Sequence, residues 1–192
     1  MRTSTLERNT TETKINLSLN LDGTGAYSNH TGCGFLDHML DLFARHGRFD
    51  LEVACQGDSD VDFHHTVEDV GIVLGKAFLE ALGDMRGIKR YGHVLLPMDE
   101  VLMLAAVDIS GRATLVCGVD IKPAKVGGMD TELAQEVMLG FCRNLRATVH
   151  FKQLSGDNAH HIIEAMFKGL ARAMREAVTV EGNEIPSTKG VI

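Results

Sequence analysis

Apolar and polar residues alternate along several short stretches, and this alternation predicts strands. The run Ile15 to Leu21 alternates strictly before the turn signal Asp22-Gly23, and Leu102 to Ile109 is its counterpart before Ser110-Gly111. Period-two patterns that end in glycine-containing turns are typical of half-buried strands. The segments 49–55 and 147–151 also read as strands. We therefore expect strands in both halves of the chain.

Helical periodicity occupies the stretches that follow or separate these strands. Residues 34–43 and 131–145 each predict a helix, and amphipathic runs at 75–82 and 169–177 predict two more. Each half then reads strand, strand, helix, strand, helix, which predicts an α+β fold with sheets covered on one face by helices. The glycine-rich stretch Gly83 to Gly92 interrupts the periodicity, so we place the boundary there and expect half-repeats at residues 1–88 and 89–192.

A polar motif occurs twice in the chain. His64-His65-x-x-Glu68 returns half a chain later, with the same spacing, as His160-His161-x-x-Glu164. The polar residues match while many apolar neighbours differ, and this favours chemistry over packing as the reason for the repeat. The chain therefore reads as an internal duplication of one unit.

The spacing of the motif predicts where its side chains point. On a helix, neighbouring residues diverge by about 100°, whereas residues four apart share a face. The two histidines of one motif therefore cannot easily bind the same ion, while the glutamate reaches the face of either. We predict a pair of metal ions, each with ligands from both halves; imidazole and carboxylate donors suit Mn, Fe, Zn, Co or Ni.

The repeat also predicts a third pair of ligands. His38 precedes the first motif, and Glu136 lies in the corresponding helical segment before the second. If the halves superpose, these two residues become equivalent ligands. We expect Asp37 and Asp41 to accept hydrogen bonds from a ligating imidazole.

Composition narrows the class of protein. Hydrophobic residues make up 44% and charged residues 23% of the 192 residues, and no apolar run is long enough to cross a bilayer. A net charge of −7 disfavours nucleic-acid binding, which needs clustered cations. The four cysteines are scattered and the first residues are polar, so we expect reduced thiols, no secretory signal and a cytoplasmic protein.

With these residues in view, the chain resembles the imidazoleglycerol-phosphate dehydratase family along nearly its full length. The blocks that carry the resemblance are Arg8–Thr13, Gly34–Leu40, Phe63–Gly71, Arg90–Gly92, Pro97–Glu100, Asp108–Arg112, Asn158–Ala165 and Ile185–Gly190. The resemblance implies a duplicated fold similar to the second domain of ribosomal protein S5, trimers assembled into an octahedral shell, and two Mn²⁺ ions held between subunits.

The same resemblance implies site residues. The implied metal ligands are His38, His64, His65, Glu68, His160, His161 and Glu164, with Glu136 where many family members have histidine. The implied catalytic residues are Glu12, His65, Glu68, His161 and Glu164. The implied substrate-binding residues are Glu12, His38, Arg90, Arg112, Lys168, Ser187 and Lys189, with His46 and Asp99 as further candidates.

The implied reaction is the dehydration of imidazoleglycerol phosphate to imidazoleacetol phosphate in histidine biosynthesis. The C–H bond to be broken has no neighbouring carbonyl, so a base alone would fail. Metal ions on the substrate's imidazole nitrogens would favour the imidazolate, which can expel the hydroxyl while Glu12 takes the proton. A dinuclear metallohydrolase and a noncatalytic, shell-forming metal-binding protein are the alternatives.

Overall fold

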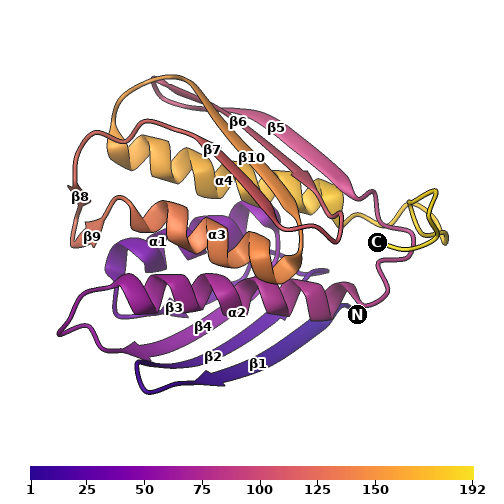
Figure 1. Cartoon of the computed structure of the whole chain (residues 1–192), viewed down its shortest axis with the longest axis horizontal. Coiled ribbons are helices and arrows are strands. Elements are labelled where there is room, and N and C mark those ends of the chain that lie inside the picture. The colour runs from indigo at the N-terminus through magenta and orange to yellow at the C-terminus, as the bar shows by residue number, and fades with distance from the viewer.

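Two four-stranded sheets enclose four helices in the computed structural model, which describes all 192 residues (Figure 1). The first sheet has the order β1 (Thr3–Asn9), β2 (Thr13–Asn20), β4 (Asp50–Gly57), β3 (Tyr27–His30). The second has the order β5 (Tyr91–Met98), β6 (Val101–Asp108), β10 (Thr148–Ser155), β7 (Thr114–Gly118). A two-stranded ribbon, β8 (Lys125–Val126) and β9 (Met129–Asp130), lies outside them.

The helices form the central layer of the molecule. They are α1 (Gly34–Gly47), α2 (His64–Leu82), α3 (Leu133–Leu145) and α4 (Ala159–Ala177). Helices α1 and α2 pack on the first sheet, α3 and α4 pack on the second, and the pairs α1·α4 and α2·α3 join the two layers. Each sheet thus has helices on one face, as the α+β prediction requires. None of the four helices has the length and apolar character to cross a bilayer.

The two halves share one topology, and it contains one strand more than the sequence pattern predicts. Each half runs β-β-β-α-β-α, because β3 and β7 pair in parallel with β4 and β10 at a sheet edge. In β3 only Asn29 is buried, so this strand has no alternating apolar pattern that could reveal it. Edge strands of this kind form because a neighbouring strand offers hydrogen-bond partners, which a local pattern does not record.

Each sheet takes all its strands from one of the expected half-repeats, but the core belongs to both. The first sheet uses residues 3–57 and the second uses residues 91–155. Phe43 and Phe78 from the first half meet Phe141 from the second in edge-to-face contacts, with ring centroids 6.3 and 5.4 Å from that of Phe141. Neither half can bury this aromatic cluster alone.

Helices α2 and α3 approach each other closely through glycines. A methyl group at Gly71 would lie 2.4 Å from the carbonyl oxygen of Val137, and one at Gly140 would lie 2.9 Å from that of Glu68. Only residues without a side chain allow this contact. The close packing places the turn of α3 that carries Glu136 beside the first motif. All four cysteines are free, as expected from their scatter.

Candidate active site

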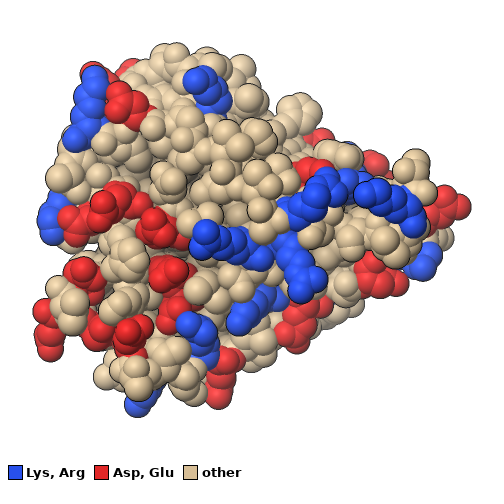
Figure 2. All heavy atoms as spheres, viewed as in Figure 1, with Lys and Arg blue, Asp and Glu red and all other residues tan.

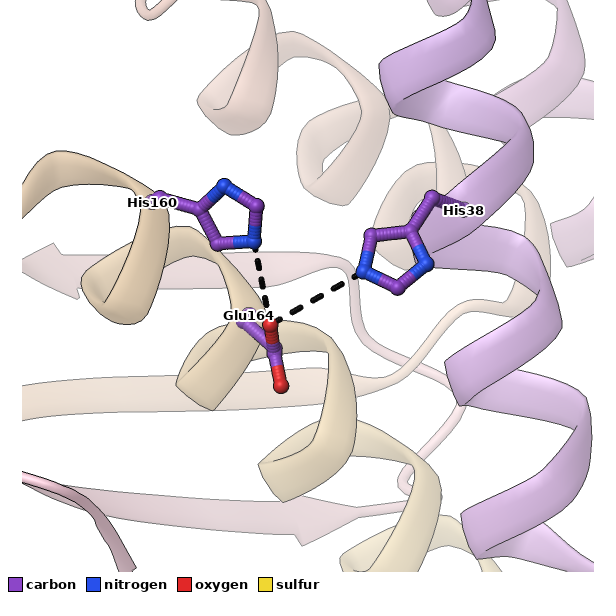
Figure 3. Close-up of side chains that lie close together, drawn as sticks. All are labelled: His38, His160 and Glu164. Carbon is purple, nitrogen blue, oxygen red and sulfur yellow. Dashed lines mark hydrogen bonds and ion pairs between the residues drawn. The ribbon is translucent and has the colours of Figure 1, made fainter.

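His38, His160 and Glu164 converge where α1 crosses α4 (Figure 3). Nε2 of His160 lies 3.2 Å from Oε2 of Glu164, and Nε2 of His38 lies 3.9 Å from the same oxygen. One ligand atom from each residue lies within 4.8 Å of the other two. Two imidazole nitrogens and one carboxylate oxygen form a donor set that fits a divalent transition metal.

The electrostatics of Glu164 favour this role. The carboxyl group is buried, with 9% of its side chain exposed, and Lys168 one turn later on α4 forms a short ion pair with Oε1. Burial alone would raise the pKa of Glu164, but the hydrogen bond from Lys168 and the nearby His160 and His38 hold this pKa below its usual value. The group is therefore ionised at neutral pH, with Oε2 turned toward the imidazoles.

The first motif forms a similar pair but not a complete cluster. Nε2 of His64 lies 4.0 Å from Oε2 of Glu68, one turn later on α2. Glu136 on α3 is half-buried and makes no ion pair or hydrogen bond with either residue. Its role as a ligand therefore stays a prediction.

The second histidine of each motif points away from the first, as the helical spacing predicts. The ring planes of His64 and His65 are 88° apart, and those of His160 and His161 are 82° apart. Nδ1 of His65 is hydrogen-bonded to Asp58 at 2.9 Å, while Nε2 lies 3.8 Å from Oε1 of Glu12. The hydrogen bond to Asp58 raises the pKa of His65.

His161 has an analogous acidic neighbourhood in the second half. Its Nδ1 is hydrogen-bonded to Glu100 at 2.8 Å, and its Nε2 lies 3.7 Å from Asp99. The bond with Glu100 raises the pKa of His161 and lowers that of Glu100. His161 thus belongs to a group with Asp99 and Glu100 that is separate from the His38 cluster.

A second set of predicted residues lines a cavity of about 710 Å³ at the C-terminal end of the chain. The expected substrate-binding residues found there are Arg90, Arg112, Ser187 and Lys189. Arg90 donates to Asp108 at 2.7 Å and to the carbonyl of Pro186 at 2.9 Å, which attaches the C-terminal segment to the cavity wall. Figure 2 shows Lys and Arg side chains gathered around this segment.

The cavity and the metal motifs lie at opposite ends of the helices. His64 begins α2, whereas Leu79, near the other end of this helix, lines the cavity. A rise of about 1.5 Å per residue puts the two residues roughly 22 Å apart along the axis. Many of the Asp and Glu side chains visible in Figure 2 lie on the left, where α2 and α3 begin.

The paired motifs, the metal-type cluster and the cationic cavity agree with the comparisons with known proteins. A model of the family described as imidazoleglycerol-phosphate dehydratase matches residues 31–174. The chain belongs to the imidazoleglycerol-phosphate dehydratase family. The dehydratase of Azorhizobium caulinodans is 58% identical over 100% of this chain and 99% of its own length. That of Caldicellulosiruptor bescii is 52% identical over 100% and 98%.

Solved structures of the imidazoleglycerol-phosphate dehydratase family have the same fold. The crystal structure of the Staphylococcus aureus dehydratase aligns with a TM-score of 0.85 and 39% identity over 93% of this chain and 99% of that chain. That from Pyrococcus furiosus, in complex with (S)-C348, aligns with a TM-score of 0.85 and 41% identity over 97% and 100%. These matches confirm the resemblance and the duplicated α+β fold predicted from the sequence.

Two expectations about this dehydratase family member are wrong. Asp37 accepts hydrogen bonds from the backbone and hydroxyl of Thr31, and Asp41 accepts one from Asn29, so neither holds an imidazole. The two carboxylates instead attach α1 to β3 and to the residue that follows it. The acids that hold His65 and His161, Asp58 and Glu100, come from loops, which sequence proximity to His38 could not indicate.

Sequence reasoning also missed three residues of this family member's candidate site. Asp58 and Glu100 hold His65 and His161, and Arg146 lines the cationic cavity. The acidic loop before the first motif was the only local signal for Asp58.

Lys168 lies apart from the cavity, and with His46 and Arg172 it lines a separate pocket of about 360 Å³. Burial and these two cations lower the pKa of His46.

Proposed function

We propose that the chain dehydrates imidazoleglycerol phosphate to imidazoleacetol phosphate, a step of histidine biosynthesis. The observation that carries this proposal is full-length similarity to dehydratases of this name, up to 58% identity. The cavity with Arg90, Arg112 and Lys189 adds a site for a phosphate dianion, because arginine and lysine bind phosphate through charge-assisted hydrogen bonds. A cytoplasmic location suits a biosynthetic enzyme with free thiols.

Two metal ions, for which we propose Mn²⁺, fit the donor groups of the two motifs. His38, His160 and Glu164 would hold one ion, and His64 and Glu68 with Glu136 would hold the other. When bound, such ions supply the positive charge that favours the anionic form of the substrate's imidazole ring. His64 and Glu68 supply one donor each, so the second ion needs Glu136 and a ligand from another subunit to complete its coordination.

Glu12 is our choice for the carboxylate that moves the proton. Half of its side chain is exposed, and Oε1 lies 3.8 Å from Nε2 of His65. Asp58 holds the His65 ring through Nδ1, so the ring keeps its Nε2 edge toward Glu12. Asp58 also donates its backbone N–H to the carbonyl of Glu12 at 3.1 Å. The carboxylate can therefore take a proton from a substrate carbon held beside His65.

One chain cannot hold both ends of this substrate. The ring and the phosphate are joined by a three-carbon chain, which spans roughly 8 Å at about 1.5 Å per bond. The first motif and the cationic cavity of one chain are separated by roughly 22 Å along α2. We therefore propose that the cavity of one subunit faces the metal ions of another, within the trimers and octahedral shell that the family resemblance implies. His65 and His161 would complete the sites of neighbours.

Product analysis tests the proposed function. The Mn²⁺-loaded protein should convert imidazoleglycerol phosphate to imidazoleacetol phosphate and should not hydrolyse model esters or amides. Hydrolysis of those models without dehydration would favour the metallohydrolase. Metal binding and assembly without either activity would favour the noncatalytic shell protein.

A further inference from the structure

Asp69 joins three elements beneath the candidate site. It follows Glu68 on α2 and is 6% exposed. Its Oδ1 accepts a hydrogen bond from Nη2 of Arg8 on β1 at 2.8 Å, and its Oδ2 accepts one from the hydroxyl of Thr13, at the start of β2, at 2.5 Å. One buried carboxylate thus attaches both strands of the β1–β2 hairpin to the helix that carries the first motif.

The same network continues into the turn that carries Glu12. The hydroxyl oxygen of Thr10 accepts the backbone N–H groups of Glu12 at 3.2 Å and Thr13 at 2.9 Å, and it lies 3.2 Å from the Thr13 hydroxyl. Hydrogen bonds through Thr10 and Thr13 therefore connect the backbone of Glu12 to Asp69. Oε1 of the Glu12 carboxylate lies 3.8 Å from Nε2 of His65 and takes no part in these bonds.

The second half of the chain provides an internal comparison. Arg8 pairs with Ile15 on β2 as Leu96 pairs with Met103 on β6, so Leu96 is the counterpart of Arg8. Thr13 begins β2 two residues before Ile15, and Val101 begins β6 two residues before Met103, so Val101 is the counterpart of Thr13. Asp69 corresponds to Ala165, since each follows the glutamate of its motif. The three counterparts, Leu96, Val101 and Ala165, are all apolar and buried.

This comparison separates packing from function. The fold fills the equivalent place with apolar side chains, so the polar network is not required to pack a half-repeat. Replacing a buried ion pair by apolar residues is often neutral or stabilising, because the charges lose hydration on burial. The network occurs in the half whose turn carries Glu12. In the other half the turn residue Glu100 is instead held directly by His161.

We infer that Arg8, Thr13 and Asp69 are positioning residues for the dehydration, which fix the Glu12 turn against α2 so that the Glu12 carboxylate stands free beside His65. The inference rests on the proposed function of Glu12. Its physical basis is that a carboxylate on a surface turn samples many positions, whereas proton transfer requires hydrogen-bond distance to one carbon. A displacement of about 1 Å can reduce a rate by roughly 100-fold.

A matched pair of variants at Thr13 tests the inference. Thr13→Val keeps the shape and removes the hydroxyl, whereas Thr13→Ser keeps the hydroxyl and removes a methyl. We expect kcat to fall about 10- to 100-fold in Thr13→Val, with KM within about threefold, and to stay within about threefold in Thr13→Ser. A role in packing alone predicts the reverse order, because the methyl lies in a site that is 1% exposed. That reverse order would overturn the inference.

A triple variant copies the second half into the first. Arg8→Leu/Thr13→Val/Asp69→Ala should unfold at or above the wild-type temperature, bind the same amount of Mn²⁺ by elemental analysis, and lose kcat at least as strongly as Thr13→Val. If the triple variant does not fold, the Thr13 pair decides alone. Wild-type turnover in a folded triple variant would contradict the inference.

A Glu12→Gln background distinguishes failure of the inference from failure of the proposed function. If the network acts only through Glu12, adding Thr13→Val to Glu12→Gln should cause no further loss of kcat, whereas a general structural defect would add to it. A further loss overturns the inference and leaves the proposed function intact. Full activity of Glu12→Gln would refute the role of Glu12 and the inference with it.

Discussion

Glu164 and Lys168 lie one helical turn apart on α4, and the lysine ammonium holds one carboxylate oxygen while the other oxygen faces His160 and His38. The lysine thus keeps a buried acid ionised without occupying the oxygen available to a cation. A metal ligand and its charge partner are set on one helix face by their spacing of four residues.

Replacing Glu164 should remove one metal ion. Glu164→Gln keeps the shape of the side chain but not its charge, so we expect the Mn²⁺ content to fall from two ions per chain to about one in elemental analysis of the purified protein. Glu80→Gln, on the exposed face of α2, is the control and should retain both ions. Because Glu164→Gln leaves Lys168 without its partner, Glu164→Gln/Lys168→Met should recover stability without recovering the ion.

Mixing two impaired variants should restore activity, assayed at a substrate concentration near the wild-type KM, if the site is shared between subunits. Glu164→Gln damages the metal cluster, and Arg112→Ala damages the cationic cavity. These two sites lie at opposite ends of the helices. Subunits that are dissociated, mixed and reassembled should recover a substantial fraction of wild-type turnover, because some sites then combine two intact ends. Mixing Arg112→Ala with Lys189→Ala should recover none. Equal activity in both mixtures would exclude a shared site.

Arg112 should contribute to substrate affinity and not to folding. Its side chain is 62% exposed and its ion pair with Asp108 is long, at 3.6 Å, so its charge is available to a phosphate. Arg112→Ala should raise KM about 10- to 100-fold, equivalent to about 1.4 to 2.8 kcal/mol, with an unchanged unfolding temperature. Steady-state kinetics measure this change, and Arg143→Ala, on the exposed side of α3, provides the matched loss of charge.

Asp50 should stabilise the fold only while it is ionised. Backbone N–H groups of Thr24, Ala26 and Gly25 and the amide of Asn20 bind its carboxylate, and the bond from Thr24 contributes most to a pKa below the usual 3.8. Asp50→Ala should lower the free energy of unfolding by about 1.5–3 kcal/mol at neutral pH. Because the folded-state pKa is lowered, this difference is present above about pH 3.8 and shrinks as the pH falls through the lower, folded-state value.

Urea unfolding at several pH values measures the contribution of Asp50. Glu52→Ala is the control, since Glu52 is exposed on the same strand. A difference between Asp50→Ala and wild type that stays constant down to the lowest pH at which the protein folds would contradict the assignment.

The sequence predicted most of the secondary structure because its signals are local. The alternation at Ile15 to Leu21 and the helical run around His38 record burial of one face, and both elements formed as expected. Strand β3 was missed because its residues are mostly exposed and its only reason to be extended is the neighbouring strand β4. The same limitation applies to the acids around the histidines: Asp37 is near His38 in sequence, yet it binds Thr31.

What the sequence determined by itself is the duplication, the helical setting of both motifs, and the divergence of His64 from His65. These follow from the periodicity of a single helix, which depends only on neighbouring residues. Only the tertiary structure decided that Asp58 and Glu12 meet His65, that Asp69 holds the Glu12 turn, and that the cationic cavity lies far from the motifs. Those relations join residues on separate elements, and their distances depend on how helices pack between sheets, which no local pattern encodes.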